Sequence, residues 1–241
     1  YFTNYGVIIL LMTLIIKAVL MPLTFKSYMS SARMRVLKPQ MEEINAKYPG
    51  QDKAMDRQRA TMELYSNAGV NPMSGCLPLL LQMPILLAMF AFFPSSIELR
   101  QQPFMWADDL SSYDTIFTWD AYIPLITPYF GNHISLFCLL MTITNILYTK
   151  INMDSTGGGQ QMPGMKLMMY LMPLMFLFIF NNYASGLSYY YFVSLLITII
   201  QTYIFRKCIN EEKVLAKLKE NQKKPRKKSG FMARLEEAQR Q

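Results

Sequence analysis

The sequence predicts an all-α, polytopic membrane protein with five transmembrane helices. Apolar residues make up 52% of the 241 positions and charged residues 17%, whereas an average soluble domain carries about 25% charged residues. The charges are also unevenly distributed, because several long stretches carry none. Such a composition excludes disordered, collagen-like and coiled-coil chains. Helices are expected because open strands cannot satisfy their backbone hydrogen bonds in lipid.

Four apolar stretches reach the roughly 20 residues that crossing the hydrocarbon layer requires. The last, 167–205, is nearly twice that length, and Asn181 to Gly186 offer the turn chemistry that would divide it. The predicted spans are 5–25, 73–95, 132–150, 164–181 and 187–206. The chain is therefore divided into a first span within 1–26, a cytoplasmic hairpin at 27–72, a second span at 73–95, a periplasmic loop at 96–131, a third span at 132–150, a cytoplasmic link at 151–163, the fourth and fifth spans within 164–206, and a basic tail at 207–241.

The basic residues predict the orientation of these spans. Apart from Lys17 within the first span, 22 of the Lys and Arg residues fall on one side and only Arg100 falls on the other. Because basic loops remain in the cytoplasm, the N-terminus is expected outside and the tail inside. Four aromatic residues of the outer loop are expected to form a belt at the membrane interface: Trp106, Trp119, Tyr122 and Tyr129.

Cysteine and histidine usage argues against an enzyme, a metal site or a cofactor. The three cysteines are far apart, and His133 is the sole histidine. No disulfide framework, metal-ligand spacing, catalytic triad or nucleotide-binding motif is recognisable. We therefore expect no catalytic residues, no metal and no cofactor. The chain starts at Tyr1 without Met or a basic leader, so it is expected to be a piece of a longer protein.

The cytoplasmic segment is predicted to fold as a helical hairpin. A helix capped by Ser30 or Ser31 would run to about Lys47, and a second would run from about Lys53 to Asn67 and stop at Gly69. The first helix carries an apolar stripe at helical spacing: Met34, Leu37, Met41 and Ile44. The stripe could close the hairpin on itself, or it could contact a client or partner.

Lys17 is the most informative residue of the sequence, because it lies inside the first span and no span contains Asp or Glu. A charge at the bilayer centre costs about 2.5–3.5 kcal/mol even on the lenient insertion scale. Lys17 must therefore be solvated by carbonyls, hydroxyls or water, which favours a hydrated cavity. The alternative is a structural lysine tucked against carbonyl groups.

Polar residues of other spans could line that cavity. The fifth span carries a hydroxyl and amide stripe at helical spacing, although such residues also serve ordinary helix contacts in membranes. The candidate lining residues are Thr13, Thr24, Gln82, Asn145, Ser188, Tyr191, Ser194, Thr198 and Gln201. The fourth span instead carries a methionine ridge of Met165, Met168, Met172 and Met175, which could face lipid or core, or offer a pliable surface to varied apolar helices.

Several ordered blocks resemble the YidC family of membrane protein insertases, which includes the mitochondrial and thylakoid insertases. They are Leu20-Met21-Pro22-Leu23-Thr24, the segments 34–39, 70–85 and 98–101, and Ser185-Gly186-Leu187 with Tyr190-Tyr191. The block with two prolines around Gln82 is highly specific, and the match extends from about residue 5 to 207. The outer-loop block is similar to the Gram-negative branch, whose additional N-terminal span and periplasmic domain would lie upstream of Tyr1.

The resemblance implies a five-span core around a hydrophilic groove, open to cytoplasm and lipid and closed to the outside, in a bacterial inner (plasma) membrane. The family carries one basic residue in the groove, usually Arg, and the matching position here is Lys17, which lacks the planar fork of Arg. The implied function is that of an insertase and chaperone for nascent membrane proteins. A greasy client surface on the second and fourth spans would include Leu86, Phe90, Met172 and Phe176.

The basic tail has two interpretations. It could anchor to anionic lipid, or it could contact ribosomal RNA, as family members with long basic tails do. The residues concerned are Lys223, Lys224, Arg226, Lys227 and Lys228. A Sec translocon is a further possible partner, and sequence-specific DNA binding is not expected.

A transporter or channel is the rival function, in which Lys17 would be an anion or proton site. That function requires a gated route to both sides and usually internal repeats, and no repeat relates the halves of this sequence. A membrane enzyme is improbable, because the spans lack acidic residues and no nucleophile motif is present.

Overall fold

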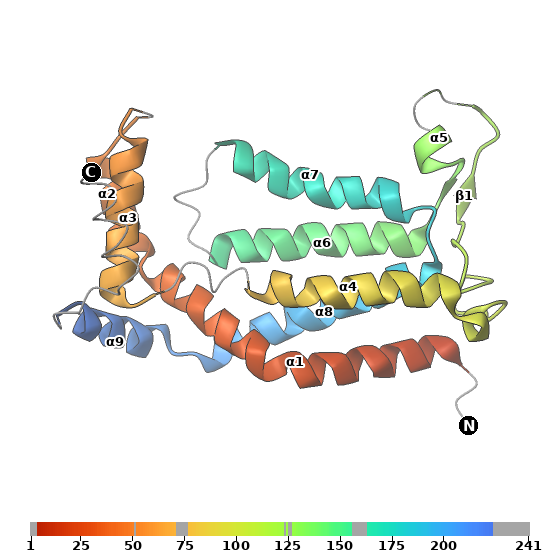
Figure 1. The fold of residues 1–241 in the computed structure, drawn as a ribbon, viewed down its shortest axis with the longest axis horizontal. Coiled ribbons are helices and arrows are strands. Elements are labelled where there is room, and N and C mark those ends of the chain that lie inside the picture. The colour runs from red at the N-terminus through yellow and green to blue at the C-terminus, as the bar shows by residue number, and fades with distance from the viewer. Residues whose placement is uncertain are drawn as a thin grey trace, which may run out of the picture.

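Long helices run side by side and form the body of the molecule (Figure 1). In this computed structural model the described residues are 4–50, 52–70, 77–122, 124, 127–155 and 163–223. The helices are α1 (Tyr5–Val36), α4 (Leu77–Ser95), α6 (Leu136–Ser155), α7 (Pro163–Phe180) and α8 (Ser185–Cys208). The central helix is α8, which contacts α1, α4 and α6, while α7 packs against α6. The predicted all-α class is confirmed.

The two ends of this bundle carry different structures (Figure 1). One end holds the hairpin of α2 (Lys38–Lys47) and α3 (Ala54–Ala68), with α9 (Glu211–Lys223) beside it. The other end holds the loop between α4 and α6, with the short 3₁₀ helix η2 (Ile97–Leu99) and α5 (Thr127–Phe130). Two-residue strands β1 (Phe117–Thr118) and β2 (His133–Ile134) pair antiparallel in this loop.

Three of the described helices are long and apolar enough to cross a membrane: Tyr5–Val36, Leu136–Met153 and Ser185–Cys208. Two shorter apolar helices, Gln82–Ser95 within α4 and Leu167–Phe180 within α7, run alongside them. The count of five spans therefore stays a prediction. The 32 residues of α1 correspond to about 48 Å, which is longer than the roughly 30 Å hydrocarbon layer.

The expected cap at Ser30 or Ser31 is wrong, because α1 continues without a break to Val36. The helix ends at Leu37, and α2 begins with Pro39 in its first turn. Proline lacks the backbone N–H and its ring crowds the carbonyl four residues earlier, so it is favoured in the first turn of a new helix, where that N–H would have no partner. Pro22 lies inside α1, which changes direction along its length in Figure 1, as expected for a helix that contains proline.

The end of the hairpin agrees with the sequence-based expectation. α3 ends at Gly69, which adopts φ +69°, a left-handed conformation that glycine tolerates without steric cost. The stripe residues Met34, Leu37 and Met41 are buried, and they pack with residues of α3 and with Leu218 of α9. These three stripe residues therefore pack within the chain, in a buried cluster with Tyr65, Ala68 and Leu218 that we call the hairpin base.

Buried apolar residues are concentrated toward the two ends of α1 and α8. The main core includes Ile9 of α1 and Tyr190 and Val193 of α8. All three lie closer to the N-terminal ends of their helices than the level of Lys17. A smaller cluster joins Tyr28 and Ala32 to Phe205, beyond that level. The segment that carries Lys17 lies between these two clusters.

Candidate functional site

Lys17 lies in α1, a helix that is long and apolar enough to cross a membrane. It follows Tyr5 by about 18 Å at the rise of an α-helix, which is about half of the hydrocarbon thickness. The neighbouring side chains Ile15 and Val19 are 64% and 71% exposed, so the rest of the chain leaves one face of this helix uncovered. Lys17 itself is half-buried and is directed to α8.

A hydroxyl of α8 binds the ammonium group of Lys17. Lys17 Nζ donates a hydrogen bond to Thr198 Oγ1 at 2.9 Å, and Thr198 Oγ1 donates to the carbonyl oxygen of Ser194 at 2.8 Å. The two helices run in the same direction from the end of the bundle that carries the loop between α4 and α6. We call this the outer end, after the orientation that the sequence predicts. Thr198 follows Ser185 by the same number of residues as Lys17 follows Tyr5, to within one residue. Among the described residues, no carboxylate forms an ion pair with Lys17.

Other members of the α8 stripe carry buried polar atoms. Ser188 Oγ and Gln201 Oε1 are buried and have no hydrogen-bond partner among the described residues. Buried polar atoms without protein partners commonly bind water. These two positions lie on either side of Thr198, so the polar stripe extends along α8 above and below Lys17.

Of the remaining predicted lining residues, Thr13 and Thr24 lie on α1, Gln82 lies on α4 and Asn145 lies on α6. Thr13 is fully buried and donates to the Ile9 carbonyl at 2.7 Å, and Thr24 donates to the Leu20 carbonyl at 3.0 Å, so their own helix satisfies both hydroxyls. Gln82 of α4 lies beside the hydroxyls of Tyr190 and Tyr191 of α8. Asn145 is half-buried on α6.

The predicted apolar client surface divides into an exposed part and a packed part. Met172 is 52% exposed on α7, and Met168 and Met175 are exposed beside it. Phe90 of α4 instead packs against Phe180, with ring centroids 5.0 Å apart. Leu86 and Phe176 are partly buried against the same core. The methionines therefore form the outer layer, and the aromatic residues join α4 to α7 beneath it.

The outer end contains a buried carboxylate that the sequence did not single out. Asp114 is 3% exposed and accepts hydrogen bonds from Trp106 Nε1 at 2.9 Å and from the backbone N–H groups of Leu136 and Phe137 at 2.9 and 3.2 Å. It also accepts from the hydroxyl of Ser135. Asp114 therefore caps the start of α6, where a negative charge is favoured. Trp106, expected in an interfacial belt, is tied into this cap.

Asn181 completes the outer end from the turn between α7 and α8. Its amide nitrogen donates to the carbonyls of Phe130 and His133, and its amide oxygen accepts from Ser135 N. Glycine 186 packs so tightly that an added Cβ would lie 2.9 Å from the carbonyl oxygen of Leu110. Loop and helices are thus hydrogen-bonded and closely packed at this end of the bundle.

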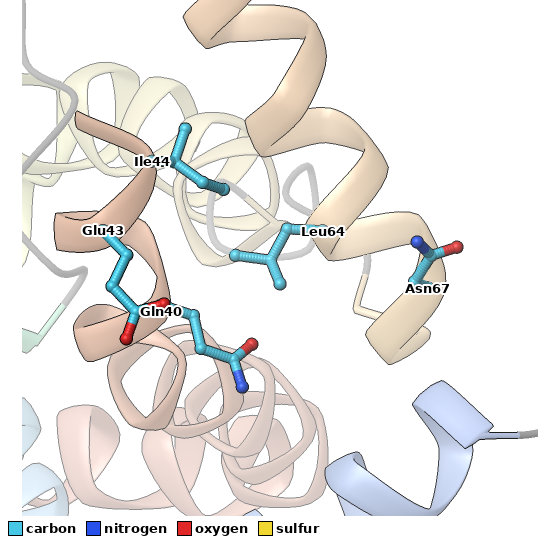
Figure 2. Close-up of a pocket in the computed structure, with 5 residues that line it drawn as sticks. All are labelled: Gln40, Glu43, Ile44, Leu64 and Asn67. Atoms are coloured by element: carbon cyan, nitrogen blue, oxygen red, sulfur yellow. The ribbon is translucent and has the colours of Figure 1, made fainter. Parts of the chain in front are cut away.

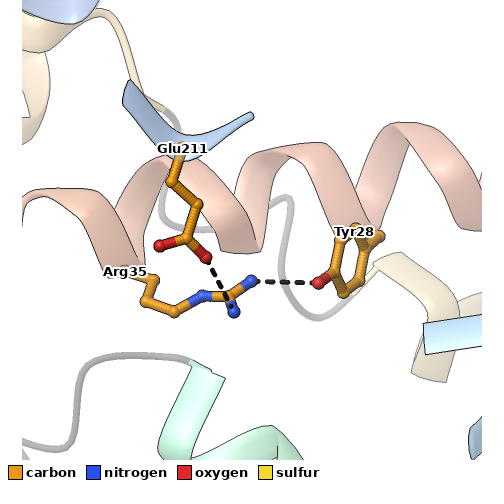
Figure 3. Close-up of polar contacts among 3 residues, drawn as sticks. All are labelled: Tyr28, Arg35 and Glu211. Atoms are coloured by element: carbon orange, nitrogen blue, oxygen red, sulfur yellow. Dashed lines mark hydrogen bonds and ion pairs between the residues drawn. The ribbon is translucent and has the colours of Figure 1, made fainter. Parts of the chain in front are cut away.

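An ion pair ties the last turns of α1 to α9 (Figure 3). Arg35 Nη1 lies 3.2 Å from Glu211 Oε1, and Arg35 Nη2 donates to the Tyr28 hydroxyl at 3.0 Å. Leu218 of α9 is buried in the hairpin base beside Tyr65. Burial raises the pKa of the Tyr65 phenol above its ordinary value. We call this contact region, formed by Tyr28, Arg35, Glu211 and Leu218, the α9 brace.

An open pocket lies between the two hairpin helices (Figure 2). It is lined by Gln40, Glu43 and Ile44 of α2 and by Leu64 and Asn67 of α3. The lining mixes polar and apolar groups and includes one carboxylate, so it has no concentrated charge. The basic tail residues Lys224, Arg226, Lys227 and Lys228 lie outside the described residues, and Lys223 is the last residue of α9.

Comparison with known proteins gives one consistent relationship. The sequence model of the 60Kd inner membrane protein family matches residues 1–213. The membrane protein insertase YidC of Parabacteroides distasonis is 76% identical over 238 residues, which are 98% of this chain and 38% of that protein. The proteins of the same name from Porphyromonas gingivalis and Bacteroides fragilis are 59% and 56% identical, covering 100% and 99% of this chain and 39% and 38% of theirs. The chain thus spans about two fifths of the length of these relatives.

Proposed function

Because the chain belongs to the 60Kd inner membrane protein family, we propose that it forms the core of an inner-membrane insertase and chaperone for nascent membrane proteins. The observation that carries this proposal is Lys17, a half-buried ammonium at mid-membrane depth whose described partner is a hydroxyl. A cation without an anionic neighbour is suited to attract an anionic group from outside the protein. The relatives are themselves named membrane protein insertase.

The polar stripe of α8 and Lys17 would together line a hydrated groove. Ser188, Ser194, Thr198 and Gln201 offer hydroxyl and amide groups to water, and Gln82 and Tyr191 extend the polar lining toward α4. Water that reaches half the membrane depth shortens the low-dielectric path that a client's polar tail must cross. Lys17 would attract acidic residues of that tail.

The exposed methionines of α7 would then receive the client's apolar helix. Met172 offers a flexible thioether surface that adapts to different side chains, while Leu86, Phe90 and Phe176 support it from within the bundle. Transfer of the client's apolar residues into lipid would drive release. The action is physical, with no covalent step, so we expect no enzymatic activity.

The outer end would act as the closed side of the groove. Asp114 and Asn181 hold the loop, α6 and the turn before α8 together through buried hydrogen bonds, which supports a seal on the side opposite to the hairpin. This arrangement fits the orientation expected from the basic residues, with the outer loop in the periplasm and the hairpin and α9 in the cytoplasm.

The cytoplasmic end would meet the partners that deliver clients. The hairpin and the basic tail fit contact with a ribosome, whose RNA attracts Lys and Arg without sequence specificity. Anionic lipids would bind the same basic residues, and a Sec translocon would be a cooperating partner. The rival transporter function, with Lys17 as an anion or proton site, would need a path through the outer end, where Asp114, Asn181 and Gly186 are tightly packed.

Replacing Lys17 with Glu tests the proposed function. We expect Lys17→Glu to abolish insertion of a single-span client with an acidic outer tail, because the groove would then repel the tail, and we expect Lys17→Arg to be tolerated. Insertion is measured by protease protection of the client tail in cells depleted of the wild-type protein. Lys26→Glu, an equal charge change at an exposed site on the same helix, is the matched control. Normal insertion by Lys17→Glu would contradict the groove-charge mechanism.

A further inference from the structure

We propose that Thr198 is a positioning residue that holds the Lys17 ammonium at mid-depth on the α8 side of the groove. The inference rests on the proposed insertase function and goes one step further, since it names the group on which that cation depends. It is carried by the pair of hydrogen bonds that Thr198 Oγ1 makes, to Lys17 Nζ at 2.9 Å and to the Ser194 carbonyl at 2.8 Å.

Lysine in a membrane span needs such a partner more than arginine does. Its ammonium is a point charge on a flexible four-carbon chain, and lysines in membranes extend that chain toward the polar interface. The exposed side chains of Ile15 and Val19 leave lipid beside Lys17, so the side chain has room to move. A fixed acceptor at the same depth on α8 counteracts this tendency.

The hydroxyl of Thr198 is oriented to accept. A hydroxyl has one proton and two lone pairs, and the proton of Thr198 is committed to the Ser194 carbonyl. The lone pairs therefore remain for Lys17, and back-bonding to the preceding turn restricts the side chain to one rotamer. Thr198 thus offers Lys17 a preorganised acceptor.

A nearby threonine provides a matched control. Thr202 lies one turn further along α8, and its hydroxyl donates to the Thr198 carbonyl at 2.7 Å in the same back-bonded geometry. The described structure gives Thr202 no contact with Lys17. A change from Thr to Val preserves the shape of the side chain and removes the hydroxyl at either site. Only Thr198→Val also removes the acceptor of Lys17.

The test combines Thr198→Val and Thr202→Val with Lys, Arg or Ala at position 17. With Lys17 present, we expect Thr198→Val to reduce insertion of a client with an acidic tail about tenfold, as for loss of a hydrogen bond to a charged group. Thr198→Ser and Thr202→Val should leave insertion within about twofold of the wild-type level. In the Lys17→Arg background, Thr198→Val should have little effect, because guanidinium has five donors. In the Lys17→Ala background, Thr198→Val should have no effect on insertion.

A second measurement reports where the ammonium lies. An amine-reactive reagent that cannot cross the membrane is added from the cytoplasmic side, and modification of the peptide that contains Lys17 is measured by mass spectrometry. We expect Thr198→Val to raise this modification severalfold and Thr202→Val to leave it unchanged.

Three outcomes separate the inference from the function on which it rests. An equal loss of insertion from Thr198→Val in all three backgrounds would assign Thr198 to helix packing and overturn the inference. Unchanged insertion and unchanged Lys17 modification in Thr198→Val would overturn it as well. Normal insertion by Lys17→Ala would instead contradict the proposed function itself, whatever the Thr198 variants do.

Discussion

Two charged residues in this chain show opposite solutions to burial. Asp114 is enclosed at the outer end and accepts hydrogen bonds from a tryptophan, a serine and two backbone N–H groups, so the protein alone satisfies it. Lys17 has one described acceptor for three N–H groups, which leaves donors for water or an incoming carboxylate. A satisfied charge stabilises a structure, whereas an incompletely satisfied one is suited to bind.

Removing the Asp114 carboxylate should destabilise the outer end. We expect Asp114→Ala to lower the free energy of unfolding by at least about 2 kcal/mol, because it removes a helix cap and leaves buried donors without partners. Thermal unfolding in detergent, followed by the fluorescence of the two tryptophans of this loop, Trp106 and Trp119, measures this. Asp108→Ala, at an exposed position of the same loop, should have little effect. An Asp114→Ala protein as stable as the Asp108→Ala protein would show that the cap is dispensable.

Helices and turns were predicted best where the local chemistry decides them. The end of α3 at Gly69 and the turn after Phe180 follow from glycine and asparagine, and both were predicted correctly. The start of the hairpin was predicted wrongly at Ser30 or Ser31, because a serine side chain only permits a helix start, whereas Pro39 is favoured in the first turn of the helix that begins at Lys38.

Contacts between distant elements were harder to predict than the elements themselves. Glu211 meets Arg35, and Leu218 enters the hairpin base, although 176 positions separate the ion pair in the sequence. Periodicity identified the polar stripe of α8, and it did not reveal which hydroxyl would meet Lys17. Asp114 was missed for the same reason, because an irregular loop has no period that would mark an inward-facing side chain.

Loosening the α9 brace should free the hairpin. We expect Leu218→Ala to cost about 2–5 kcal/mol of local packing energy and to increase amide hydrogen exchange across α2 and α3. Lys219→Ala, at an exposed position of the same helix, should leave exchange unchanged. Exchange is measured by mass spectrometry on the intact chain in detergent. Equal protection in both variants would mean that α9 does not restrain the hairpin.

At the level of the whole chain, the two ends of the bundle differ both in structure and in charge. The hairpin and α9 lie at one end of the helical body, and the loop between α4 and α6 lies at the other (Figure 1). The sequence predicts this division through the 22 basic residues on one side and the single Arg100 on the other. Helix packing alone would not assign either end to the cytoplasm, since both ends are polar.

Cysteine labelling tests the predicted orientation. In a background without Cys76 and Cys138, we expect Ile97→Cys, at an 82% exposed site of η2, to react in intact spheroplasts with a maleimide that cannot cross the membrane. Cys208, which is exposed at the end of α8, should react only after the membrane is opened. Labelling of Cys208 in intact spheroplasts would reverse the orientation.

The unbroken course of α1 links the hairpin mechanically to the ammonium group. A single helix carries Lys17, Tyr28 and Arg35, and about 28 Å of continuous backbone joins Lys17 to Val36. Pro22 is the one point along that distance where the missing backbone hydrogen bond makes bending easy. If a partner bound the hairpin, the stiffness of α1 at Pro22 would decide how much of a hairpin displacement reaches the ammonium group of Lys17.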